Sequence, residues 1–294
     1  MIYVLVPAYN EASTVGLLLW KVRRVFTAFA REYQLLVVND ASTDGTDALL
    51  APYARALPLT LVTHRERRGY ARSVEELLRL AVARTDKPRR DLAVVLQADF
   101  SDSPDDIPEL VRRIESGADV AFADYRRRAG TPRRETLVRR ALPWLLRGAA
   151  GASLDHRLDW VCSLKAARLV TLARLFSEHG GAPLLTSEGW AADAELLLEL
   201  ARHARRVEVV PSAGAAPRRQ RPSRAAPLKA GWMVWRMARA RAPAKAPSAV
   251  APSPQSAAPA PTPATSRTRA PGRRGKRRGR RHAAPPPPSH PVAP

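Results

Sequence analysis

The sequence predicts an α/β fold built on a mainly parallel sheet, and two observations support this class. Short apolar runs alternate with longer segments in which apolar side chains recur at helical spacing. Three of the apolar runs, at residues 2–9, 35–38 and 92–96, are followed directly by acidic or turn-forming residues. Strands separated by helices pair in parallel, and such sheets bind ligands at the carboxyl ends of their strands. We therefore expect the functional site at that edge.

The first part of the chain divides into regular elements. Val15, Leu18 and Val22 share one helical face, and Thr14 is available near the start of that helix as a cap. The same reasoning predicts strands at 2–9, 35–38, 59–63, 92–96 and 118–122, and helices at 11–30, from the turn at 43–46 to 56, at 70–84 and at 104–115.

The second part of the chain is less regular. Residues 136–146 and 191–203 carry helical patterns, and residues 207–210 form an apolar run typical of a last strand. Residues 159–165 are compatible with a strand or a turn. Residues 227–242 form a separate basic amphipathic segment, for which two interpretations are open, a helix in a membrane interface or a helix packed on the domain.

The chain is strongly basic, and half of its excess charge lies near the C-terminal end. The net charge is +22, and residues 241–294 contain nine arginines, two lysines and no Asp or Glu. This end is rich in Pro, Ala and Ser, so we expect 243–294 to be a disordered tail. The tail indicates an anionic partner such as a membrane surface, or only a solvated extension. Nucleic acid is less expected, because no aromatic residues interleave the basic block 273–281.

The composition excludes several kinds of site. A single cysteine, Cys162, rules out an intrachain disulfide framework, and the six histidines are scattered without zinc-ligand spacing. Met1 leads directly into a predicted strand without a signal segment, and no uninterrupted apolar stretch approaches about 18 residues. We therefore expect a cytoplasmic protein whose contact with a membrane, if any, is peripheral and at the inner face.

Three segments carry the chemistry, and they resemble a known family. They are Val-Pro-Ala-Tyr-Asn-Glu at 6–11, Val-Val-Asn-Asp-Ala-Ser-Thr-Asp-Gly-Thr at 37–46 and Leu-Gln-Ala-Asp-Phe-Ser-Asp at 96–102. Their order and wording resemble family 2 glycosyltransferases, most closely the dolichyl-phosphate (polyprenyl-phosphate) mannosyl synthase type. The resemblance implies a GT-A fold over residues 1–226, with a Rossmann-like nucleotide-binding half joined to an acceptor half.

The resemblance assigns the nucleotide to residues that follow the first two strands. Pro7, Tyr9 and Glu11 follow the first strand, and Val38 and Asp40 end the second. The two carboxylates can accept hydrogen bonds from the base or the ribose. The alternative for Asp40 is a structural role at a turn or a helix start.

The resemblance also implies a metal site after the fourth strand. The family's Asp-x-Asp appears here as Gln97-Ala98-Asp99, so the second Asp is present and the first is Gln. Mg²⁺ or Mn²⁺ prefers oxygen ligands and offsets the charge on a departing diphosphate. We expect Asp99 and Gln97 to hold the ion weakly, or an arginine to share the task. Two roles are open for Asp102: it compensates for Gln97, or it acts at the start of the next helix.

Further correspondences concern phosphate groups. The family's acceptor-side Asp-x-x-Ser-Gly-Phe-Arg appears as Asp159 to Lys165, and the resemblance implies catalytic positions for these two residues together with Asp99. Arg218 and Arg224 correspond to the pair of cations that closes over the diphosphate, and an exposed basic linker is the alternative for them.

These correspondences predict an inverting hexosyltransferase that uses GDP- or UDP-hexose, with polyprenyl phosphate as the expected acceptor. An anionic phosphate needs no strong base, whereas a hydroxyl acceptor needs one, for which Asp159 and Glu188 are candidates. The rival hypothesis is a degenerate, non-catalytic module recruited to membrane or nucleic acid by its basic tail. Gln97 favours it, and so does Asp124, which stands where the family has an arginine.

Overall fold

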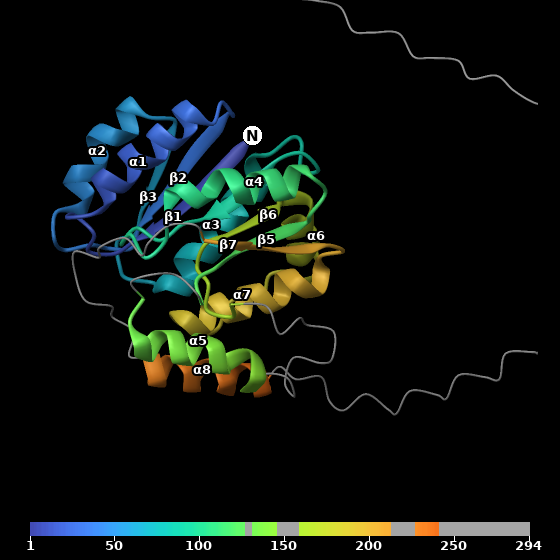
Figure 1. Cartoon of the computed structure of the whole chain (residues 1–294). Helices are drawn as coiled ribbons and strands as arrows, with labels where there is room; N and C mark the ends of the chain where they lie inside the picture. The colour runs from blue at the N-terminus through green and yellow to red at the C-terminus, as the bar shows by residue number, and fades with distance from the viewer. Residues whose placement is uncertain (127–130, 146–158, 213–226, 241–294) are drawn as a thin grey trace, which may run out of the picture. The chain divides into compact units, whose positions relative to one another are not determined.

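The computed structural model describes residues 1–126, 131–145, 159–212 and 227–240 of the 294-residue chain. These residues belong to one compact unit, Met1–Pro247, built on a seven-stranded sheet with helices on both faces (Figure 1). The predicted tail 243–294 lies outside the described residues.

The sheet has the strand order β3-β2-β1-β4-β6-β5-β7. The first four strands of the chain pair in parallel, as do β5 and β7, whereas β6 runs antiparallel to both of its neighbours. The predicted α/β class with a mainly parallel sheet is therefore confirmed. The strands are β1 Ile2–Ala8, β2 Tyr33–Asn39, β3 Leu59–Thr63, β4 Leu92–Val95, β5 Val120–Asp124, β6 Lys165–Arg168 and β7 Val207–Pro211.

Helices cover the two faces of the sheet and extend below it (Figure 1). A short 3₁₀ turn, η1 Pro104–Asp106, leads directly into α4. The α-helices are α1 Val15–Ala28, α2 Thr46–Ala56, α3 Tyr70–Arg84, α4 Ile107–Glu115, α5 Arg133–Leu145, α6 Leu169–His179, α7 Trp190–His203 and α8 Pro227–Ala240.

Both faces of the sheet are buried, which explains why β1 and β4 are apolar at every position. On β1, Ile2, Val4 and Val6 pack with side chains of α1, α2 and α4. The alternate residues Tyr3 and Leu5 pack with side chains of α3, α6 and α7. This alternation is the period of two that a strand imposes, and in a parallel sheet covered on both sides it leaves no polar face.

Two elements differ from the sequence prediction. The segment predicted as strand or turn at 159–165 is a turn that leads into β6, which begins only at Lys165. The prediction contains no helix at α6, although Leu169, Leu172 and Leu175 lie at helical spacing and are buried. The signal for α6 is therefore present in the sequence.

The basic segment predicted at 227–242 contains helix α8, which packs on α5 and α7. Ala230, Val234, Met237 and Ala238 form its buried face. Among the residues that the structure describes, no helix is both long enough and apolar enough to span a bilayer.

Candidate functional site

The candidate site lies at the carboxyl edge of the sheet, where β2, β1 and β4 are neighbours. In the register, Pro7 lies beside Val38 and Ala8 lies beside Asn39. Strand β4 pairs with the other side of β1, also in parallel. Parallel pairing therefore brings the three segments that the sequence singles out to one edge of the sheet.

The chain turns sharply after each of these three strands. Asn10, Ala41 and Phe100 have φ angles of 54°, 56° and 59°, and among the described residues they are the non-glycine positions with positive φ. A left-handed backbone costs a non-glycine residue about 1–3 kcal/mol and persists only where the surrounding structure fixes it. The strain is thus concentrated at the edge where the candidate site lies.

Hydrogen bonds tie the loop after β1 to the loop after β2. Asn10 Oδ1 accepts from the Thr43 amide at 2.8 Å, and the Asn10 amide donates to Ser42 Oγ at 2.9 Å. Glu11 is buried, and its Oε2 accepts from the Thr14 hydroxyl at 2.9 Å. The two loops predicted to hold the nucleotide therefore form one connected wall.

Asp40 is buried beneath the loop between β3 and α3. Its Oδ1 accepts from the Arg68 amide at 2.7 Å, and its Oδ2 accepts from the Gly69 amide at 2.9 Å. His64 Nδ1 lies 2.7 Å from Asp40 Oδ1, and His64 Nε2 lies 2.8 Å from Glu76 Oε2. Asp40 therefore fixes this loop at the edge of the site.

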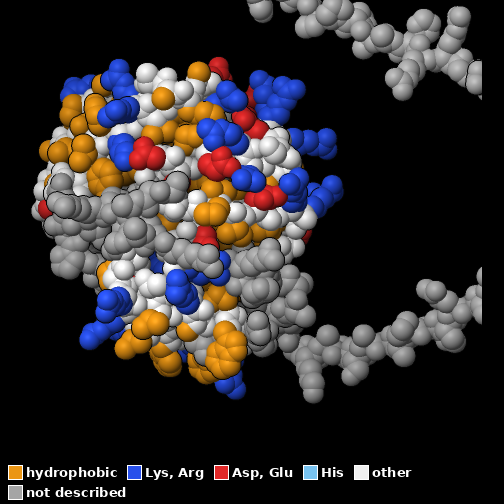
Figure 2. Space-filling view, in the orientation of Figure 1, with side chains coloured by type: hydrophobic (Ala, Val, Ile, Leu, Met, Phe, Trp, Pro, Cys, Tyr) orange, Lys and Arg blue, Asp and Glu red, His pale blue; other side chains and the backbone are white. Residues whose placement is uncertain are grey.

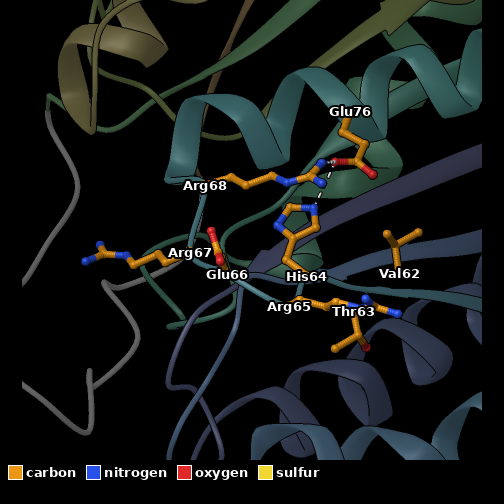
Figure 3. Close-up of a pocket in the computed structure, with 8 residues that line it drawn as sticks. All are labelled: Val62, Thr63, His64, Arg65, Glu66, Arg67, Arg68 and Glu76. Carbon is orange, nitrogen blue, oxygen red and sulfur yellow. Dashed lines mark hydrogen bonds and ion pairs between the residues drawn. The ribbon is translucent and has the colours of Figure 1, made fainter.

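A pocket of about 490 Å³ opens beside the same loop (Figure 3). Arg68 and His64 both approach Glu76, and Arg68 Nη1 lies 3.4 Å from Glu76 Oε2 (Figure 3). The Arg67 guanidinium lies over the ring of Tyr9, with 4.1 Å between Cζ and the ring centroid. The pocket is lined by Val62, Thr63, His64, Arg65, Glu66, Arg67, Arg68 and Glu76.

His64 is a residue of this edge that the sequence prediction misses. It follows β3 directly, just as Asp40 follows β2. The strand-end rule that selects the other segments therefore also selects His64. Its contact with Glu76 joins a strand end to a helix and has no signal in the sequence.

The predicted metal ligands lie on the loop after β4. Gln97 and Asp99 are half-buried, and Ala98 between them is buried. Asp99 Oδ1 accepts from the Ser101 amide at 2.9 Å, which closes a tight turn through Phe100. Within the described residues, no group of three or more His, Cys, Asp or Glu side chains converges as a metal site. The two side chains nevertheless supply oxygen atoms, the ligand type that Mg²⁺ and Mn²⁺ prefer.

Asp102 joins this loop to the acceptor-side segment. It is fully buried, its Oδ2 accepts from the Gln97 amide at 2.9 Å, and its Oδ1 accepts from the Ser163 hydroxyl at 2.6 Å. Burial raises the pKa of the Asp102 carboxyl to about 6, although the two hydrogen bonds act in the opposite direction. The sequence leaves two roles open for Asp102, compensation for Gln97 or action at the start of the next helix. The structure shows a third role, a hydrogen-bonded link between two loops.

Lys165 forms a buried ion pair at the start of β6. Its Nζ lies 2.7 Å from Asp193 Oδ1 on α7, and both side chains are inaccessible to solvent. The Tyr70 hydroxyl donates to the same oxygen at 2.9 Å, and burial raises the pKa of Asp193 and of Tyr70. Glu188, one of the two candidate bases, accepts a hydrogen bond from the Tyr70 amide at 3.1 Å.

Asp159 is held by a guanidinium. Arg139 Nη1 donates to Asp159 Oδ2 at 2.8 Å, and Arg139 Nε donates to Glu135 Oε1 at 3.0 Å. The Tyr125 amide also donates to Asp159 Oδ2, at 3.2 Å. Asp159 is therefore tied both to α5 and to the backbone at Tyr125, which fits a positioning role in the acceptor-side loop.

Asp124, which stands where the family has an arginine, lies at the end of β5 and pairs with the next-but-one residue, Arg126, with Arg126 Nη2 at 2.8 Å from Asp124 Oδ2. Arg218 and Arg224 lie outside the described residues, as do residues 127–128.

The sequence model of Glycosyl transferase family 2 matches residues 3–167, which is more than half of the 294-residue chain. The chain belongs to glycosyl transferase family 2. The part that matches family 2 runs from β1 into β6 and contains the strand-end segments and the acceptor-side segment described above.

Two curated relatives are named undecaprenyl-phosphate 4-deoxy-4-formamido-L-arabinose transferase. The relative from Aeromonas hydrophila is 27% identical over 168 residues, which are 57% of this chain and 49% of the relative. The relative from Pseudomonas paraeruginosa is 30% identical over 129 residues, which are 43% of this chain and 37% of the relative. The chain thus spans about half the length of the curated relative from Aeromonas hydrophila, and less of the other.

Solved structures share the fold. The glucosyl-3-phosphoglycerate synthase of Mycobacterium tuberculosis with phosphoglyceric acid has a TM-score of 0.55 at 21% identity, covering 82% of this chain and 80% of that one. The same enzyme with Mn²⁺, UDP-glucose and phosphoglyceric acid has a TM-score of 0.53 at 21% identity, covering 82% and 79%. The mannosyl-3-phosphoglycerate synthase of Rubrobacter xylanophilus has a TM-score of 0.56 at 18% identity, covering 82% and 73%. The predicted GT-A type of fold is therefore confirmed.

Proposed function

We propose that the chain transfers a hexose from a nucleoside diphosphate sugar to a polyprenyl phosphate, with inversion at the anomeric carbon. The observation that carries the proposal is the gathering of three strand-end segments at one edge of the sheet, in a chain of family 2. The names of the relatives contain undecaprenyl phosphate, which supports a polyprenyl-phosphate acceptor. UDP-glucose in a structural neighbour supports a uridine donor, and GDP-hexose is the other candidate.

The donor nucleotide would lie along the wall formed by the loops after β1 and β2. Tyr9, over whose ring the Arg67 guanidinium lies, is assigned to this wall, and Pro7 and Val38 lie side by side at the strand ends. Glu11 and Asp40 supply carboxylates for the base or the ribose. Both are buried and hydrogen-bonded, so they are held in place before the donor arrives.

Gln97 and Asp99 are the proposed ligands of Mg²⁺ or Mn²⁺, with the backbone at Ala98 beside the donor. The presence of Mn²⁺ with UDP-glucose in a structural neighbour supports a divalent ion. A bound ion would offset negative charge on the departing diphosphate. Arg218 and Arg224 are the proposed cations that close over the same diphosphate.

The chemistry of the acceptor decides what the other residues must do. A phosphate oxygen of polyprenyl phosphate is anionic at neutral pH, so it can attack the anomeric carbon without a general base. The bond from that carbon to the donor diphosphate breaks, and the nucleoside diphosphate leaves. We assign Asp159 and Lys165 to hold the acceptor-side loop, because each is fixed by a buried partner of opposite charge.

Such an enzyme would act in the cytoplasm and meet its lipid acceptor at the inner face of the membrane. Nucleic acid is not a proposed partner. The alternative, a non-catalytic module, requires that donor binding be lost, and this is what the following experiment decides.

The proposal is tested by calorimetric titration of the full chain with GDP, UDP, their hexose conjugates and a UDP-linked pentose, with and without Mn²⁺. Transfer of labelled sugar to undecaprenyl phosphate in detergent is then measured with the donor that binds. Saturable, metal-enhanced binding followed by transfer supports the proposal. A folded chain that binds none of these nucleotides supports the non-catalytic module.

The metal site is tested by Asp99→Ala, with Asp105→Ala as the matched control. Asp105 is exposed on η1, six positions further along, where it pairs with Lys21 and accepts from the Ser103 hydroxyl at 3.2 Å, so its substitution changes charge near the site and leaves Gln97 and Asp99 in place. We expect Asp99→Ala to abolish the enhancement of donor binding by Mn²⁺ and Asp105→Ala to preserve it. Unchanged affinity in Asp99→Ala would sink the assignment.

A further inference from the structure

Helices α5 and α8 pack side by side and present large apolar side chains to solvent on their outer side. Leu137 and Trp144 of α5 are 67% and 69% exposed, and Leu228 and Trp232 of α8 are 76% and 55% exposed. Figure 2 shows hydrophobic side chains gathered over these two helices, with Lys and Arg side chains beside them. Exposed apolar residues that cluster in this way mark an interaction surface, whereas scattered ones do not.

The inner sides of the two helices are buried by close packing. A Cβ built at Gly231 of α8 would lie 2.9 Å from Val138 Cγ1 of α5, so the glycine permits the approach of the two helices. The buried face of α8 packs toward α5 and α7. The exposed residues therefore belong to a second, outer apolar face of a helix pair whose core side is complete.

Positive charge surrounds this outer face. The acidic residue on the two helices, Glu135, is buried and paired with Arg139, so it does not offset the exposed cations. The guanidinium of Arg236 lies 5.1 Å from the ring centroid of Trp232, which places a cation and an amphipathic ring together at the surface. The exposed cations of the two helices are Arg133, Arg134, Arg140, Lys229, Arg236 and Arg239.

We propose that the outer face of α5 and α8 is a docking surface for an anionic lipid bilayer and lies in its interfacial zone. Leucine and tryptophan side chains enter the boundary between headgroups and acyl chains, while Lys and Arg reach the anionic headgroups. A nucleic acid would use the cations but not the leucines. The combination of aliphatic, indole and cationic groups without an exposed acid on either helix fits a lipid surface.

The inner side of α5 connects this surface to the acceptor-side loop. Arg139 on α5 donates to Asp159 at 2.8 Å, and Asp159 begins the segment that leads to Lys165. A helix that rests on the bilayer would therefore hold the loop beside which a lipid phosphate is proposed to react. This part of the inference rests on the proposed function, whereas the docking itself does not.

The test measures partition of the full chain into vesicles of phosphatidylcholine with and without phosphatidylglycerol. It is done at low and at high ionic strength, because salt screens the attraction exerted by all exposed cations, those of the basic end and those of the two helices alike. The variant Leu228→Ser/Trp232→Ser removes two exposed apolar side chains from one helix. Its matched control is Leu17→Ser/Trp20→Ser on α1, where the two side chains are 52% and 51% exposed.

We expect partition into the anionic vesicles to fall at least about tenfold in the α8 variant, which corresponds to about 1.4 kcal/mol. The α1 control should change it by less than about twofold, as a surface substitution away from the interface does. Equal loss in the two variants would overturn the proposal and assign vesicle binding to any exposed apolar side chain. No loss in the α8 variant would overturn it and assign vesicle binding to charge alone.

Two further measurements keep the inference separate from the proposed function. Tryptophan fluorescence of the unmodified chain should be quenched by anionic vesicles that contain brominated lipid, and absence of quenching would overturn the docking. Sugar transfer to undecaprenyl phosphate in detergent should be the same in the α8 variant and the unmodified chain, because no bilayer is present. If the unmodified chain and the α8 variant both fail to transfer sugar in detergent, while the unmodified chain docks normally on vesicles, the proposed function is refuted and the docking surface is not.

Discussion

We expect Asp102→Asn to remove a pH-dependent penalty from the free energy of unfolding. The Asp102 carboxylate is fully buried and accepts hydrogen bonds from the Gln97 amide and the Ser163 hydroxyl. An asparagine can keep both contacts, because its oxygen accepts from the amide while its NH₂ donates to the hydroxyl oxygen. The substitution therefore removes the charge and preserves the link between the two loops.

The magnitude follows from the pKa of Asp102. Burial raises that pKa from its ordinary value of 3.8 to about 6, so the folded chain binds this proton more tightly than the unfolded chain. The free energy of unfolding therefore falls as pH rises from about 4 to about 6. The difference between 3.8 and about 6, at 1.36 kcal/mol per pH unit, is about 3 kcal/mol.

The assay is urea unfolding followed by far-ultraviolet circular dichroism at several values between about pH 4 and pH 7 without divalent ions, where the linkage acts. Relative to the unmodified chain, the variant should gain about 3 kcal/mol between the two ends of this range. Asp105→Asn, at an exposed position, serves as the control and should show no such gain. A stability difference between Asp102→Asn and the unmodified chain that stays constant with pH would refute the reasoning.

Three further substitutions test other parts of the edge. Gly69→Ala should lower the melting temperature in a thermal scan, because Gly69 has φ of 92° and a Cβ there would lie 2.5 Å from Glu188 Oε1. An unchanged melting temperature would show that an alanine causes no strain at this position. Lys165→Met should cost about 3–5 kcal/mol in urea unfolding, since Asp193 would keep a buried charge without its cation; a loss below about 1 kcal/mol would mean that the pair is weakly coupled. Gln97→Asp should lower the Mn²⁺ concentration needed for donor binding in the calorimeter, and no change would separate Gln97 from the ion.

Local sequence patterns predict most of the helices and strands. The elements that are predicted are those in which apolar residues recur at a clear helical or strand spacing. The bounds predicted at 59–63 and 70–84 coincide with β3 and α3. In α3, Val74, Leu77 and Ala81 mark one buried face, and Gly69 precedes the first turn. The strand-end rule then predicts, without any knowledge of side-chain contacts, the edge of the sheet at which the structure gathers the three segments.

The buried pairings could not be predicted, because they join residues that are distant in sequence. Asp102 and Ser163 are 61 positions apart, and Lys165 lies 28 positions from its partner on α7. The sequence leaves a membrane interface open for the segment 227–242, but it does not show that α5 shares the same outer face with α8. Both helices carry apolar residues on more than one side, so only the packing decides which of them, Trp144 among others, remain in solvent.

The antiparallel strand β6 has a consequence for how the chain is made. Strands β4 and β5 do not pair with each other, and Ala166 of β6 lies between Val94 and Ala121. A nascent chain that has emerged only as far as β5 therefore carries two unpaired strand edges in the middle of its future sheet, and such edges recruit other chains. The sheet closes only when residues 165–168 arrive, a long-range step of the kind that folds slowly. Substitutions that delay this closure should reveal themselves as poor soluble yield during synthesis, even when the finished protein is stable and active.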